Sequence, residues 1–104
     1  MTDLEMTKLC AEAMGLGGKE VNNQWRLVMM MPLESYVVLY DPLHDDAQAM
    51  ALVEKFELWI DKHIAGDIWN AHVIADTGPT HMGESENLNR AIVECVAKMQ
   101  KEKP

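Results

Sequence analysis

Apolar residues recur at helical spacing in three stretches of the chain, which predicts helices over residues 3–14, 46–56 and 87–101. Thr2 and Glu5 form a capping box at the start of the first helix. The apolar positions are Met6, Leu9, Cys10 and Ala13, then Ala49, Leu52, Val53 and Phe56, and finally Leu88, Ala91, Ile92, Cys95, Val96 and Met99. We therefore expect three amphipathic helices, each with one buried face.

The junction before the second helix has the strongest local signals. An Asp-Pro pair at 41–42 breaks the extended run that precedes it. Asp45 is a good N-cap with Gln48 at the third helical position. Gln48, Glu54 and Lys55 are expected to face water.

Runs rich in β-branched, aromatic and other apolar residues predict strands over residues 24–31, 36–40, 57–63 and 68–75. Residues 57–63 alternate as a strand does, yet their apolar positions also extend the stripe of the preceding helix. The strong strand signal over 68–75 favours a hairpin and therefore the strand interpretation.

Glycine and polar residues predict the connections. Gly15, Gly17 and Gly18 indicate a flexible exit from the first helix, and residues 32–35 are long enough for a hairpin turn. Residues 76–85 read as a polar loop, the loop most suited to carry a site. The predicted fold is a single-domain α/β (α+β) sandwich over residues 1–104, of order α-β-β-α-β-β-α, with a mainly antiparallel sheet packed by helices.

The net charge of −8 and the pI near 4.8 argue against direct nucleic-acid binding, because gripping phosphates needs a basic face. An acidic chain is instead attracted to basic protein surfaces. Mimicry of DNA is a weaker alternative, since nine lysines and arginines are interspersed among seventeen acidic residues.

The two cysteines, Cys10 and Cys95, lie on apolar helical stripes and are expected to be buried free thiols. The first five residues do not resemble a secretion signal, and no apolar run reaches membrane-spanning length. We therefore expect a cytoplasmic protein without a membrane partner.

Candidate chemistry is sparse. Asp41, His44, Asp45 and Asp46 could suggest a hard-metal or acid/base cluster, but capping and turn formation account for most of them. The histidines at 63, 72 and 81 lack zinc-ligand spacing. No catalytic residue, metal site or cofactor is predicted.

Three stretches, residues 9–15, 40–53 and 88–100, resemble small bacteriophage and prophage proteins of the phage ABA sandwich domain family. The resemblance implies helices around a small sheet and a phage origin. It supplies no catalytic motif that could be transferred to this chain. Residues 19–39 and 76–86 show no such likeness.

We expect a phage-encoded small acidic accessory protein that binds and inhibits or redirects a bacterial host protein, for example in anti-defence, in the host cytoplasm. Its expected partner-binding residues are Asp41, His44, Asp45, Asp76, His81, Glu84 and Glu86. The alternative is a small enzyme or ligand-sequestering protein with a pocket formed by His72, Asp76, His81, Trp59 and Trp69. A homodimer is also expected, because one chain of this size has little to cover Trp25 and Met29 to Met31.

Overall fold

The structure, a computed structural model, describes residues 1–31, 34–62, 66–75 and 78–102, with residues 27–31, 34–38, 74–75 and 78–81 described by their backbone only. Within these residues the chain forms three helices and two three-stranded antiparallel sheets. The elements are α1 (Asp3–Ala13), β1 (Gly18–Val21), β2 (Gln24–Met31), β3 (Glu34–Tyr40), α2 (Asp46–Phe56), β4 (Trp59–Lys62), β5 (Trp69–Ala75), β6 (Gly78–Ser85) and α3 (Leu88–Lys101).

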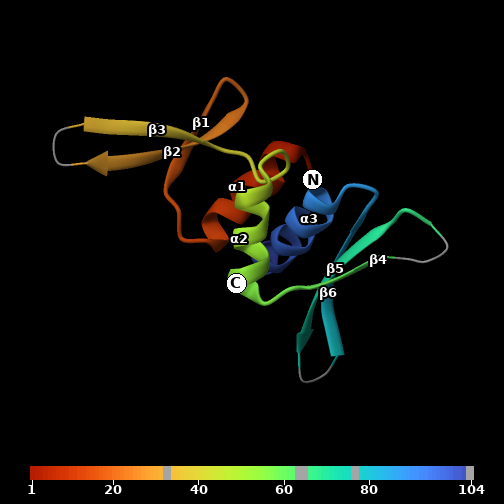
Figure 1. The fold of residues 1–104 in the computed structure, drawn as a ribbon. Helices are drawn as coiled ribbons and strands as arrows, with labels where there is room; N and C mark the ends of the chain where they lie inside the picture. The colour runs from red at the N-terminus through yellow and green to blue at the C-terminus, as the bar shows by residue number, and fades with distance from the viewer. Residues whose placement is uncertain (32–33, 63–65, 76–77, 103–104) are drawn as a thin grey trace.

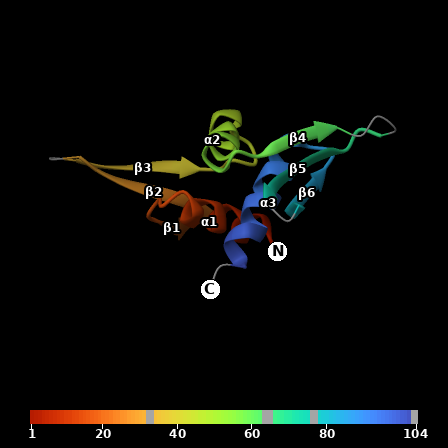
Figure 2. The same ribbon diagram turned by 90° about the horizontal axis from the view of Figure 1, so that it is seen from below.

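The α+β fold class is confirmed, but the strands form two sheets, sheet A (β1–β3) and sheet B (β4–β6). The helices lie between the two sheets, which project in opposite directions (Figures 1 and 2). The molecule is therefore elongated, with principal extents of 51, 28 and 22 Å. None of the helices in the described ranges is both long and apolar enough to cross a membrane.

Helix α3 is the centre of the core. It packs against α1, α2, β5 and β6, and its side chains from Ala91 to Val93 and from Cys95 to Ala97 are buried. The predicted buried faces of α1 and α2 meet this helix, with Cys10 and Leu52 fully buried. Cys10 and Cys95 are both buried thiols that form no disulfide, as predicted.

The predicted helix starts are confirmed in atomic detail. Thr2 accepts a hydrogen bond from the Glu5 backbone N–H at 3.1 Å, and Asp45 accepts one from Gln48 at 3.0 Å. Asn87 caps α3 in the same way, accepting from Arg90. These local bonds satisfy backbone donors that a helix start leaves without intrahelical partners.

Gln48 corrects a prediction, because its side chain binds the end of β3 instead of facing water. Its Oε1 accepts a hydrogen bond from the Asp41 backbone N–H at 2.6 Å, and its Nε2 donates to the Leu39 carbonyl at 3.1 Å. One side chain therefore ties the start of α2 to the strand before it.

Two strands were missing from the prediction. Residues 18–21, at the predicted flexible exit, form β1, which pairs with β2 through a two-residue turn at Asn22 and Asn23. Both asparagines have positive φ (51° and 62°), as a type I′ hairpin turn requires. The predicted loop over 76–85 is wrong for residues 78–85, which form β6. The predicted strand at 57–63 is confirmed as β4, over a shorter range.

Candidate interaction surface

The two faces of sheet B have different surroundings. Cross-strand partners in an antiparallel sheet share a face, and side chains alternate between faces along each strand. Ala71 and Gly83 are register partners on the face that packs against α3, where both are buried. A Cβ added at Gly83 would overlap the Ala91 carbonyl of α3. This inner face is therefore part of the core.

The opposite face carries a row of large side chains that crosses the sheet. Trp59 of β4 pairs with His72 of β5, which pairs in turn with Met82 of β6. Trp59 is 61% exposed and Met82 is 40% exposed. Neither belongs to the hydrophobic core or to the residues packed against it. Two of the exposed large hydrophobic residues of the described chain therefore flank one histidine on one face.

A polar row runs beside the apolar one. Asp61 pairs with Asn70, and Asn70 pairs with Glu84, on the same face as Trp59 and His72. Asn70 is only 7% exposed, and its Nδ2 donates to Asp61 Oδ1 at 3.1 Å. The amide oxygen of Asn70 is buried without a hydrogen-bond partner among the described residues. This row presents three acceptors side by side.

We call these two rows, Trp59, His72 and Met82 with Asp61, Asn70 and Glu84, the outer face of sheet B. Its strand positions carry no lysine or arginine. The nearby cations have other partners than the side chains of this face. Lys62 lies over the Trp69 ring on the inner face, 5.2 Å from its centroid, whereas Lys98 contacts Glu94 at 3.0 Å and donates to the Met82 backbone carbonyl at 2.8 Å. The outer face is therefore both apolar and acidic.

The predicted partner-binding residues are divided between two places. Glu84 lies on the outer face of sheet B. His44 lies at the start of α2, where its Nδ1 is 2.7 Å from Asp41 Oδ2, and Asp45 caps the helix. His44 also lines a hollow of about 90 Å³ together with Asp3, Leu43, Asn87 and Arg90. Glu86 directly precedes Asn87 in the chain. Asp76 lies outside the described residues, and His81 is described only by its backbone, which pairs with Val73.

The residues at the start of α2 are used for structure. The Asp41 carboxylate contacts the His44 ring within the turn, and the Asp45 carboxylate caps α2. The Asp46 carboxylate accepts a hydrogen bond from the Asn89 amide of α3 at 2.8 Å. In the part of the chain that the structure describes, no three metal-ligating side chains gather into a potential metal site. The arrangement can position α2 on α3 without any ligand.

The alternative pocket is not assembled as expected. Trp59 pairs with His72, whereas Trp69 pairs with Lys62, three residues further along β4. The two tryptophans therefore lie on opposite faces of sheet B, and only Trp59 shares a face with His72. A single pocket lined by both rings does not form.

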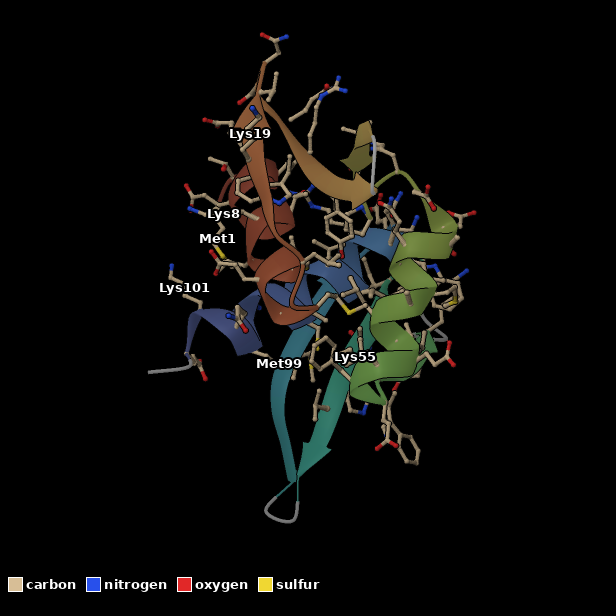
Figure 3. All side chains as sticks on the ribbon, turned by 90° about the vertical axis from the view of Figure 1, so that its left-hand side faces the viewer. Met1, Lys8, Lys19, Lys55, Met99 and Lys101 are labelled. Carbon is tan, nitrogen blue, oxygen red and sulfur yellow. The ribbon has the colours of Figure 1, made fainter. Side chains whose placement is uncertain are left out.

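A third surface lies between α1 and the end of α3. Lys8 and Lys101 lie near Met1 along one edge of the molecule (Figure 3). They line an open hollow of about 260 Å³ together with Glu5 and Glu12. The charges of both signs alternate there, so this edge does not form a basic track for phosphates.

The buried thiols are unsuited to nucleophilic chemistry. Burial raises the pKa of Cys10 to about 12, with a smaller contribution from the neighbouring Cys95, and burial raises the pKa of Cys95 to about 11. Because the thiolate is the reactive form, both groups are inert near neutral pH.

Sequence reasoning did not identify Asp61, Asn70 and Met82 as residues of the outer face of sheet B. Strand alternation could have placed Trp59 with Asp61, and Asn70 with His72. It could not join the two pairs, because the register between strands depends on their packing. The prediction of a loop over residues 76–85 gave no reason to place Met82 on a strand.

Comparison of the chain with protein-family models, curated proteins and solved structures finds no match.

Proposed function

We propose that this chain is a binding protein that recognises a protein partner through the outer face of sheet B. The observation that carries the proposal is the row Trp59–His72–Met82, whose two outer members are exposed, on a sheet whose other face packs against α3 at Ala71 and Gly83. Large side chains of this kind are enriched where proteins bind one another, and tryptophan is the commonest energetic centre of such contacts.

The charge of this face indicates what kind of partner fits it. Asp61 and Glu84 lie beside the apolar row, and the chain as a whole has a net charge of −8. Such a surface attracts a partner segment that is basic and partly apolar, and electrostatic steering speeds the encounter at low salt. We therefore expect a basic protein surface as the occupant.

The resemblance of residues 40–53 and 88–100 to small phage proteins supports a bacterial protein as the partner. In that setting, the chain acts as an accessory factor that inhibits or redirects its target, with anti-defence as one instance. An acidic protein that covers a basic surface would block whatever that surface normally holds.

A capture experiment with matched variants tests the proposal. The tagged wild-type chain and its Trp59→Ala variant are incubated with bacterial lysate, and the retained proteins are identified by mass spectrometry. Binding of the retained partner is then measured with purified proteins. Loss of a central tryptophan costs about 2 kcal/mol or more, so we expect Trp59→Ala to weaken binding by about 30-fold or more.

Met50→Ala is the matched control. Met50 is 45% exposed on α2, so this variant also removes an exposed large apolar side chain. We expect it to bind as the wild type does. A partner that binds all three proteins equally would contradict the proposed surface.

A further inference from the structure

We propose that the row Asp61–Asn70–Glu84 is a subsite for an arginine side chain of the partner, with Trp59 as its aromatic wall. This inference rests on the proposed function and names the chemistry by which the partner is recognised.

The amide oxygen of Asn70 is the first argument. Asn70 is 93% buried on the basis of its 7% exposure, and its amide nitrogen is already committed to Asp61. Its oxygen has no hydrogen-bond partner among the described residues, and Glu84 is the register neighbour of Asn70 on β6. A buried acceptor without a donor is unfavourable, so a donor supplied from outside would be stabilising there.

The groups around Asn70 determine which charge the donor group should carry. Asp61 and Glu84 flank Asn70 on the two adjoining strands, and in the described residues neither carboxylate is paired with a lysine or arginine. Directly opposed side chains are about 5 Å apart between Cβ atoms, so all three groups lie within reach of one incoming side chain. A cationic donor therefore fits better than a neutral one.

Trp59 favours a guanidinium group over an ammonium group. It lies two residues before Asp61 on β4, which places the two Cβ atoms on the same face about 7 Å apart. A planar guanidinium group can stack on an indole ring while its five N–H groups donate to several acceptors in its plane. An ammonium group has fewer donors and does not stack.

Three short peptides test this on the unmodified protein. Acetyl-Val-Arg-Val-amide is titrated into the ¹⁵N-labelled chain, and the control peptide carries citrulline, which has the shape of arginine without its charge. We expect saturable shifts of the Trp59 indole and Asn70 side-chain signals with the arginine peptide. The citrulline peptide should bind at least tenfold more weakly, and a lysine peptide at least threefold more weakly.

Charge-removing variants locate the contact. Asp61→Asn and Glu84→Gln should each lower the affinity for the arginine peptide by about fivefold or more. Glu54→Gln makes an equal change of charge at an exposed position of α2 and should leave the affinity unchanged. Thermal unfolding of each variant verifies that it is folded.

Equal binding of the arginine and citrulline peptides would overturn the subsite, and equal binding of the lysine peptide would overturn the preference for a guanidinium group. These outcomes are distinct from failure of the proposed function. If Trp59→Ala abolishes capture of the partner but the arginine peptide shows no preference, the binding surface stands and the arginine subsite is wrong.

Discussion

Gly83 of β6 lies so close to Ala91 of α3 that no side chain fits between them. A Cβ at Gly83 would overlap the Ala91 carbonyl oxygen and would stand 2.8 Å from the Cys95 backbone nitrogen. Backbone atoms of a buried helix cannot move aside as a flexible side chain can. This contact sets the distance between sheet B and the core helix, and so it supports the outer face on the other side of the sheet.

Gly83→Ala should therefore destabilise the protein by about 3 kcal/mol or more, at or above the upper end of overpacking costs. Urea unfolding followed by circular dichroism measures this change. Gly17→Ala is the matched control, because a Cβ at Gly17 meets nothing within 4 Å. The control should be neutral or slightly stabilising. Equal stability of the two variants would show that β6 does not lie against α3 as described.

Gln48→Ala should destabilise the protein by about 1–3 kcal/mol, because it leaves the Asp41 N–H and the Leu39 carbonyl without their partner. Glu54→Ala, at an exposed position of the same helix, should change the free energy of unfolding by less than about 0.5 kcal/mol. Denaturant unfolding of the two variants compares them directly. A small effect at Gln48 would mean that water replaces its side chain at little cost.

Asp45 allows structure and recognition to be separated. Asp45→Ala should cost about 1 kcal/mol, because the α2 cap is lost, whereas Asp45→Ser should stay close to the wild type, since serine is also a good N-cap. Unfolding experiments measure both. If the serine variant is stable but loses the partner in the capture experiment, the Asp45 charge is part of the interaction surface.

The core thiols should make the fold sensitive to alkali. In the unfolded chain both cysteines ionise near their ordinary pKa of 9.0, whereas in the fold the pKa values are about 12 for Cys10 and about 11 for Cys95, chiefly because of burial. Above pH 9 the unfolded chain binds fewer protons than the folded chain, so stability present below pH 9 falls as the pH rises toward 11.

The fall should approach about 1.4 kcal/mol per pH unit for each linked thiol. Urea unfolding at a series of pH values between 8 and 11 measures this slope. Cys10→Ala should lower the stability at all pH values and also make the slope shallower, since one linked proton is removed. An unchanged slope in this variant would refute the assignment of the alkaline effect to Cys10.

Much of the local structure could be predicted because its causes are local. Thr2 and Asp45 cap their helices through bonds to residues three positions on, and the apolar stripe from Leu88 to Met99 packs α3 into the core whatever lies opposite it. Reasoning from local patterns also led to the wrong prediction for Gln48. Its position on the helix predicted exposure to water, but its side chain binds the Leu39 carbonyl of the strand nine residues earlier.

The sequence alone determined the three helices, their caps, the central strands and the acidic charge, since spacing, capping and composition act over a few residues. Only the tertiary structure decided that residues 78–85 form a strand, because β6 is held by its pairing with β5 and by the absence of a side chain at Gly83. The same pairing aligns Trp59, His72 and Met82, which are up to 23 positions apart. The residues of the outer face are brought together by the register between the strands. This register depends on which side of the sheet packs against the core.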